Sequence, residues 1–292
     1  MKEEQYSLEN GRLTLIDPEL NLHIEEDFNP DLLPDELEKN TKLPGGLKLK
    51  VLQDQHGVCS EALLEKEGKT EGQCCLYYPR GELKGVSYYK GGHLHGPSRF
   101  LNEDGSILAE SWYIKGNRQG KVRHYFASGR LNSLQSYVNG ELEGTQSYYF
   151  EDGSNKTHMQ YRKGLLHGQT LLFFENGLSK REINFVNGKR KGIERQWFED
   201  GQILIECEFD GEIPVGAHKR WHSNGQVAEE RVYSDQAGKF DIRQWNVDGI
   251  LLREGVYDNE GKYTQRIWSD EGDLQEERAG YWDGKKMCWG DA

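Results

Sequence analysis

A glycine that recurs every 24 residues is the feature of this sequence that most constrains its fold. Counted from that opening glycine as position zero, a second glycine stands at position nine of the same seven units. Large apolar or aromatic residues occupy position five, and aromatic residues occupy position seventeen. A fixed period of this length is the signature of a tandem-repeat array. The opening glycines are Gly72, Gly96, Gly120, Gly144, Gly168, Gly192 and Gly216.

Each unit carries two turn signals, which in the unit beginning at Gly168 are Asn176-Gly177 and Asn187-Gly188. Asn-Gly favours a two-residue type I′ turn, because both turn residues need a positive φ. The short runs between the turns are rich in aromatic and branched residues, which favour strands. We therefore expect an all-β fold, an elongated, twisted, single-layer antiparallel meander of tandem 24-residue hairpins.

The regions flanking the array differ from it in composition and pattern. Residues 1–47 are acidic; alternating apolar residues around Asn10-Gly11 predict a β-hairpin, and later prolines indicate a linker. Residues 48–71 form a degenerate repeat, residues 72–286 the array, and residues 287–292 a C-terminal cap. Atypical terminal segments are expected, because they must end an otherwise open strand edge.

Charge and segment composition restrict the partners and the compartment. Of the net charge of −12, residues 1–47 contribute −8, from 12 acidic and 4 basic residues. This balance disfavours binding to nucleic-acid phosphates. The N-terminus lacks the apolar core of a secretory signal, and no run of 18 apolar residues occurs. We expect a cytoplasmic protein, with export by a signal-less route left open.

The sequence contains no recognisable catalytic or cofactor motif. It lacks G-x-S-x-G, H-E-x-x-H, a P-loop and G-x-G-x-x-G, so we predict no catalytic residues and no cofactor. His93 and His95 lack further ligands nearby in sequence, so no metal site is predicted. The five cysteines are odd in number, and adjacent Cys74 and Cys75 are poorly placed for a disulfide; we expect buried, reduced thiols.

Opposite charges repeat within the units, with Arg or Lys at position three and Glu at position fourteen. If the turn is centred on positions eight and nine, antiparallel partners sum to seventeen, so these two positions face each other. Such pairs support the register, although each surface ion pair stabilises by only ~0–1 kcal/mol. The predicted pairs are Arg99–Glu110, Arg195–Glu206, Lys219–Glu230, Arg243–Glu254 and Arg266–Glu277.

Tryptophan occupies position five in the last four units, on the same side of the sheet as position three. Since Trp and Arg are enriched in interface hot spots, this row is a candidate interaction face. Packing within the sheet, with Arg stacked on Trp, is the alternative. Positions six, eleven and seventeen are expected to form the opposite, apolar face, covered by curvature, the N-terminal segment or a partner. The candidate residues are Trp197, Trp221, Trp245, Trp268, Arg195, Lys219, Arg243 and Arg266.

The repeated pattern, G-x-x-x-x-aromatic-aromatic-x-x-G-x-L followed by aromatic-x-x-G, resembles the variant MORN repeat of bacterial proteins. The resemblance covers about residues 48–290 and is clearest over 72–260. It implies a sheet of successive hairpins that serves as an interaction scaffold. Some bacterial members are labelled as antitoxins, and some eukaryotic arrays are linked to membranes or dimers.

These observations favour a non-enzymatic scaffold for protein–protein interaction, with a protein partner of unknown identity. An antitoxin-like inhibitor of a toxic partner is one alternative. Peripheral membrane attachment is a second, which the acidic balance and the lack of a basic amphipathic helix disfavour. A sugar-binding sheet that uses the tryptophan row is a third. Self-association is left open, and no nucleic-acid partner is expected.

Overall fold

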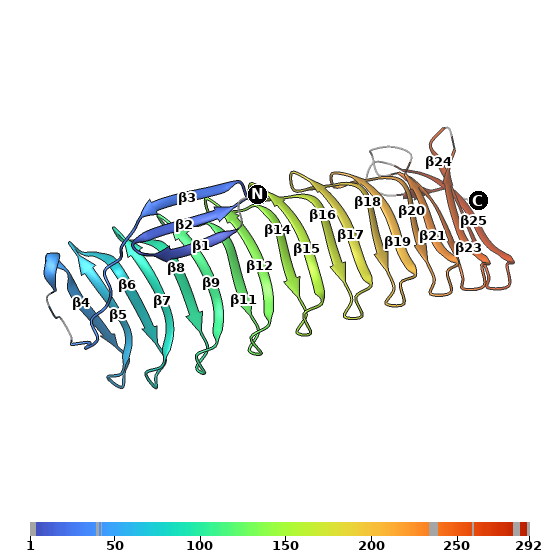
Figure 1. Ribbon diagram of the computed structural model, residues 1–292. Coiled ribbons are helices and arrows are strands. Elements are labelled where there is room, and N and C mark those ends of the chain that lie inside the picture. Colours follow the sequence, from blue (N-terminus) through green and yellow to red (C-terminus); the bar gives the residue numbers. More distant parts are fainter. Residues whose placement is uncertain are drawn as a thin grey trace. The chain divides into compact units, whose positions relative to one another are not determined.

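The computed structural model describes residues 4–38, 41, 43–233, 239–258, 260–282 and 287–290. Within these residues the chain is all-β; it forms antiparallel strands, one short 3-10 turn at Pro44–Gly46, and no α-helix. Two compact units divide the chain, residues 1–165 and 166–292. Inside each unit the strands of the repeat array follow one another as an antiparallel meander, as the sequence predicts (Figure 1).

The first unit combines a small N-terminal sheet with the earlier repeats. Its strands are β1 (Gln5–Glu9), β2 (Arg12–Asp17), β3 (Leu22–Asp27), β4 (Lys48–Gln53), β5 (Cys59–Lys66), β6 (Lys69–Tyr77), β7 (Leu83–Lys90), β8 (His93–Leu101), β9 (Ile107–Ile114), β10 (Asn117–Arg118), β11 (Gly120–Tyr125), β12 (Leu131–Val138), β13 (Glu141–Leu142), β14 (Gly144–Tyr149) and β15 (Asn155–Arg162).

The second unit contains the later repeats, starting with a strand at the boundary. Its strands are β16 (Leu165–Phe173), β17 (Ser179–Val186), β18 (Lys189–Trp197), β19 (Ile203–Asp210), β20 (Ile213–Trp221), β21 (Val227–Tyr233), β22 (Phe240–Trp245), β23 (Leu251–Tyr257), β24 (Lys262–Trp268), β25 (Leu274–Trp282) and β26 (Met287–Trp289).

The charge pattern predicts the hairpin register correctly. Position three lies directly opposite position fourteen in all five predicted pairs, which are Arg99–Glu110, Arg195–Glu206, Lys219–Glu230, Arg243–Glu254 and Arg266–Glu277. Where the basic residue is absent, the same positions still pair, as in Cys75 opposite Val86. The register therefore comes from the repeat as a whole, and the ion pairs reinforce it.

The two Asn-Gly turns differ from each other, and the prediction is right for only one. At Asn187-Gly188 both residues have a positive φ, 50° and 80°, as a type I′ turn requires. At Asn176-Gly177 only the glycine is left-handed, with φ 83°. Gly177 N donates to Phe174 O at 3.0 Å, and the register shifts between Leu172 and Phe173. This loop is a type I turn closed by a glycine bulge, not a two-residue turn.

The bulge changes which residues share a face of the sheet. It moves the partner of position five from position twelve to position eleven, so Trp197 lies opposite Ile203 and Trp221 opposite Val227. Directly opposed residues project to the same side of a sheet. The assignment of position eleven to the face away from the tryptophans is therefore wrong. Position seventeen does lie on that other face, opposite the opening glycine.

Replacing Gly177 by valine should destabilise the second unit by more than ~1 kcal/mol, because a β-branched residue is strained at positive φ. No described atom lies within 4 Å of where its Cβ would start, so the loss should come from the backbone alone. Denaturant unfolding of the variant and its parent measures the loss. Equal midpoints would show that the turn tolerates a different backbone conformation.

The N-terminal sheet, defined as β1–β3, lies across the strands of the first unit (Figure 1). Its buried side forms the main apolar core with the array. Leu13, Leu15, Leu20, Leu22 and Phe28 are buried there, against Tyr88, Trp112, Ile114 and Val138 of the array. The N-terminal segment is one of the three covers expected for the face that carries position seventeen, and that expectation is wrong, because the segment lies on the opposite face. It covers the face that carries positions three, fourteen and sixteen.

The opening glycines permit this close packing. A Cβ at Gly120 would lie 2.1 Å from Tyr6 Cε1, and one at Gly72 would lie 2.3 Å from Asp31 O. Real Cβ atoms do not approach this closely, so any larger residue must push the N-terminal segment away. At Gly192, the same position in the second unit, nothing described lies within 4 Å. The repeated glycine therefore serves the backbone in both units and close packing in the first.

Candidate interaction faces

In the second unit the ion pairs join into one continuous row. Each Glu at position fourteen also lies opposite the basic residue of the next hairpin, as in Glu206 opposite Lys219 and Glu230 opposite Arg243. Signs alternate across the strands without a break. The members of this charge row are Glu182, Arg195, Glu206, Lys219, Glu230, Arg243, Glu254, Arg266 and Glu277.

The charge row contains five glutamates and four basic residues in alternation, and it is partly open to solvent. Arg195 Nε lies 2.8 Å from Glu206 Oε2, and Arg243 Nε lies 2.9 Å from Glu254 Oε1. Glu254 also receives Arg266 Nη1 at 3.3 Å. Each basic side chain of the row therefore pairs with at least one neighbouring glutamate, and each exposed pair stabilises by only ~0–1 kcal/mol. The row fixes strand register and presents ordered charges of both signs.

Beside the charge row runs an apolar stripe on the same face. The tryptophans at position five are partly buried, and each lies opposite an aliphatic residue at position eleven. No cation–π contact between these tryptophans and the row appears in the described part of the chain; basic groups instead stack on other rings, such as Arg190 on Phe209 at 3.8 Å. The opposed pairs are Trp197–Ile203, Trp221–Val227, Trp245–Leu251 and Trp268–Leu274.

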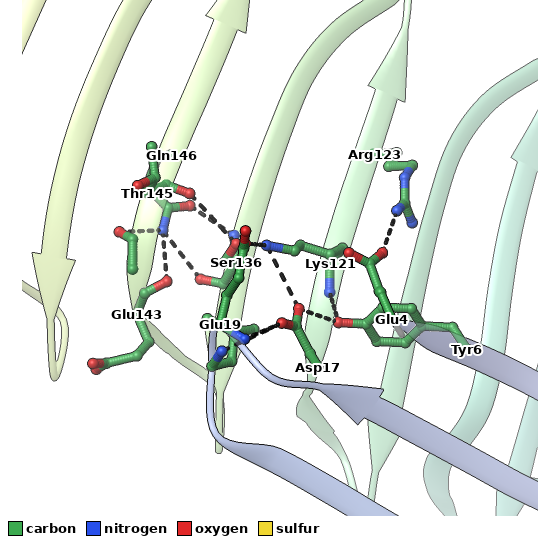
Figure 2. A network of polar contacts seen from close by, with 12 residues as sticks. Glu4, Tyr6, Asp17, Glu19, Lys121, Arg123, Ser136, Glu143, Thr145 and Gln146 are labelled. Atoms are coloured by element: carbon green, nitrogen blue, oxygen red, sulfur yellow. Dashed lines mark hydrogen bonds and ion pairs between the residues drawn. The ribbon is translucent and has the colours of Figure 1, made fainter. Parts of the chain in front are cut away.

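In the first unit the corresponding face is occupied by the N-terminal sheet, which a buried polar network anchors (Figure 2). Tyr6 Oη donates to Asp17 Oδ2 at 2.7 Å. Lys121 Nζ lies 3.5 Å from Asp17 Oδ2 and 2.9 Å from Glu19 Oε2. The side chains of Asp17 and Lys121 are only 1% and 7% exposed. Burial, together with the Asp17 carboxylate, raises the pKa of Tyr6, so its hydroxyl stays protonated.

His95 supplies a second polar link between the two layers. Its side chain is 1% exposed, pairs with Glu26 of β3, and meets the Phe28 ring edge-on at 4.6 Å between centroids. Its Nδ1 accepts a hydrogen bond from Lys115 N at 3.3 Å. Burial lowers the pKa of His95. His93 is exposed. Among the described residues, no three His, Cys, Asp or Glu side chains are grouped to hold a metal ion.

This network is not predicted by the sequence pattern, although one signal of it is present. Asp17 follows Leu13 and Leu15 at the alternation of a single strand, so it stands at a buried position of β2. A carboxylate at such a position needs a buried partner. Nothing local identifies that partner as Lys121, because it lies more than a hundred residues away.

The adjacent cysteines are buried thiols, as expected. Burial raises the pKa of Cys74 to about 12, and burial also raises the pKa of Cys75. Only thiolates react quickly with disulfide reagents, and a raised pKa keeps both thiols protonated at pH 8. We expect both thiols to resist such a reagent in the native protein and to react on unfolding. Rapid native labelling at either position, mapped by peptide mass spectrometry, would contradict this.

The described part of the chain has no helix of the length and apolarity that crossing a bilayer requires.

Comparisons with known proteins agree with the repeat. The model of the MORN repeat variant matches residues 190–210 and 214–235, two adjacent repeats of the second unit. A search of curated proteins gave no match. The crystal structure of TcdB2-TccC3 is 10% identical, covering 82% of this chain and 16% of that one, with a TM-score of 0.20. The Photorhabdus luminescens Tc holotoxin pore is 12% identical, covering 92% and 16%, with a TM-score of 0.19.

The chain thus spans about a sixth of the length of those solved chains, and TM-scores this low carry no structural argument. The matched family model agrees instead with what the chain itself displays. Its 24-residue period, its hairpin register and its glycine turns recur through both units. On these grounds the chain contains variant MORN repeats.

Proposed function

We propose that this protein is a non-enzymatic scaffold that binds a partner protein through the tryptophan face of its second unit. The tryptophan face consists of Trp197, Trp221, Trp245 and Trp268 with Arg195, Lys219, Arg243 and Arg266. One observation carries the proposal: this face of the repeat packs against a second β layer in the first unit. In the second unit, no described residue lies within 4 Å of a Cβ built on Gly192.

The chemistry of the tryptophan face suits a protein partner. Its half-buried tryptophans offer large apolar areas that can be desolvated at small entropic cost, because their neighbours already hold them. The charge row beside them offers donors and acceptors in fixed positions. Arginine and tryptophan are the residue types that most often dominate binding energy.

Truncating single tryptophans tests the proposal. Trp221→Ala and Trp245→Ala should each weaken partner binding by ~2 kcal/mol or more, about thirtyfold, through lost hot-spot contacts. The matched control is Tyr149→Ala, which removes the aromatic ring from the same repeat position in the first unit. Quantitative affinity capture from the native source identifies proteins whose recovery depends on the tryptophans, and titration with each purified candidate gives the affinity.

Both tryptophan variants should keep the array folded, because damage in one repeat is felt mainly by its neighbours. Circular dichroism and melting establish this before binding is measured. If both variants unfold the second unit while capture is unchanged, the tryptophans are packing residues and the proposal is wrong. If Tyr149→Ala reduces capture as strongly as they do, the binding face lies elsewhere.

The resemblance to bacterial MORN proteins labelled as antitoxins supports a finer version, in which the partner is a toxic protein that this chain neutralises. Coexpression with a captured partner should then restore growth that the partner alone arrests, and Trp245→Ala should abolish the rescue. Membrane attachment is less favoured, because the charge row has five glutamates against four basic residues and the whole chain carries −12. Buried, unpaired thiols at Cys74 and Cys75 fit a reducing, cytoplasmic location.

A further inference from the structure

One edge of the N-terminal sheet has unpaired backbone groups. In the three-stranded order β1-β2-β3, β1 pairs with β2 on one side and with no described strand on the other. The turn at Asn10-Gly11 has φ values of 51° and 73°, a two-residue type I′ turn. In such a hairpin the flanking pair, Glu9 and Arg12, exchanges both hydrogen bonds, and alternate residues do so thereafter. The N–H and C=O groups of Tyr6 and Leu8 therefore point outward.

The two edges of this sheet differ in how well they discourage pairing. β3 carries Glu25, Glu26 and Asp27 in succession, and charged residues on an edge strand oppose the addition of another strand. The β1 sequence, Gln-Tyr-Ser-Leu-Glu, has no proline or lysine, and its one charge, Glu9, stands at its end. The β1 edge is thus the one that can accept a strand.

A groove lies directly beside this edge. Its volume is about 310 Å³, and β1 lines one side of it with residues 6–9. The array supplies Val86, Tyr88, Pro97 and Trp112 as apolar lining. The Arg99–Glu110 pair, 2.8 Å from Nη2 to Oε1, also lines the groove, with side chains 52% and 24% exposed. The groove therefore has apolar and polar lining in similar proportion, and its charged pair is accessible.

The N-terminal sheet indicates what this groove accepts. Tyr6 and Leu8 of β1 pack toward the array, against the same core as Tyr88 and Trp112, while Ser7 alternates to the other side. The groove continues that established contact beyond the β1 edge. One more strand laid beside β1 would bond to the outward groups of Tyr6 and Leu8. Its own alternate side chains would enter the groove, in the same manner as those of β1.

We propose that the β1 edge and this groove bind an extended segment of a partner protein by β-strand addition. The segment carries apolar side chains at alternate positions, facing Tyr88 and Trp112, and a Lys or Arg on the outward side opposite Glu9. This site goes beyond the tryptophan face: it lies in the other unit and draws its affinity from backbone hydrogen bonds. The proposal for the tryptophan face and the proposal for the β1 edge can therefore be disproved independently of each other.

A displayed library of nine-residue peptides, with apolar residues at alternate positions, provides the probe. Selection of this library on the full chain should enrich peptides that have apolar residues at alternate positions. Leu8→Pro removes an outward N–H and should weaken them by at least about tenfold, whereas Leu8→Ala keeps the N–H and serves as the matched control. Leu8→Ala should retain binding within about threefold, since the backbone bonds remain.

N-methylation of the best peptide tests the pairing without altering the protein. A strand added to an edge uses only every second amide. Methylating the amides that face β1 should weaken peptide binding at least about tenfold. Methylating the alternate amides, which face away from β1, should leave binding nearly unchanged. This readout decides the matter even if Leu8→Pro unfolds the N-terminal sheet.

Two results would overturn the proposal: no alternating peptide enriched above the Leu8→Pro background, or equal weakening by both methylated sets. A third would overturn the assignment to a partner segment. If the wild-type chain self-associates by sedimentation and Leu8→Pro is monomeric, the occupant of the edge is a second copy.

Discussion

Gly120→Ala should release the N-terminal sheet from the first unit, whereas Gly192→Ala at the same repeat position should leave every layer in place. Both glycines have a positive φ, 70° and 83°, so alanine brings similar backbone strain, about 1–2 kcal/mol, at each. Only Gly120 adds a collision, because its Cβ would lie 2.1 Å from the Tyr6 ring. We expect a total loss of about 3–4 kcal/mol at Gly120 and about 1–2 kcal/mol at Gly192.

The Tyr6 ring has little freedom to avoid this collision. Its hydroxyl donates to buried Asp17 and accepts from Lys121 N at 3.2 Å, so moving the ring breaks both bonds (Figure 2). Denaturant unfolding measures the two losses, and amide hydrogen exchange of residues 5–27 reports release of the sheet. Faster exchange there in Gly120→Ala alone is the expected result. Equal losses with unchanged exchange would mean that the opening glycines serve only the backbone.

This pair of glycines shows where sequence reasoning succeeded and where it stopped. The period identified both positions and gave them one role, because every unit needs the same backbone conformation. The second role of Gly120 depends on Tyr6, which is 114 positions earlier in the sequence. No local pattern links the two residues, so the close approach could be found only once the layers were placed.

The strand register could be predicted from the sequence, whereas the assignment of residues to the two faces of the sheet could be predicted only in part. Opposed charges specify which residues pair, so the sequence predicted Arg195 opposite Glu206 correctly. Asn-Gly is compatible with both a type I′ turn and a type I turn with a glycine bulge, and the dipeptide alone does not choose. The Asn176 side chain accepts a hydrogen bond from Leu178 N at 2.9 Å, which favours the longer loop. That one extra residue moved position eleven onto the tryptophan face.

The candidate face in the second unit was predictable because it repeats, while the anchoring of the N-terminal sheet was not. Trp197, Trp221 and Trp245 recur at one position, and strand alternation places them together. Asp17 and Lys121 occur once each, and their pairing depends on how one sheet lies on another. A single buried ion pair between distant segments leaves no periodic signal.

Lys121→Met should therefore be among the most destabilising substitutions in the first unit, with an expected loss of about 3 kcal/mol. The methionine retains most of the apolar stem but leaves the Asp17 carboxylate buried without a cation. The matched control is Arg123→Met, two residues along β11. Arg123 pairs with Glu4 at 2.8 Å in the same interface, but with side chains 29% and 38% exposed. Its loss should be at most ~1 kcal/mol, because solvent screens the pair.

The double variant Asp17→Asn with Lys121→Met separates the charge from the packing. Asparagine Oδ1 can still accept the hydrogen bond that Glu19 N donates to Asp17 Oδ1 at 3.0 Å, but its amide nitrogen replaces Oδ2, so it can only donate toward Tyr6 Oη, which donates to Oδ2 at 2.7 Å in the parent. The asparagine carries no charge, so the double variant should be more stable than Lys121→Met alone, by about 1–2 kcal/mol. Denaturant midpoints of the four proteins in this cycle give the coupling. If Lys121→Met costs no more than Arg123→Met, the N-terminal sheet is held by its apolar core alone, and Asp17 is satisfied by its hydrogen bonds.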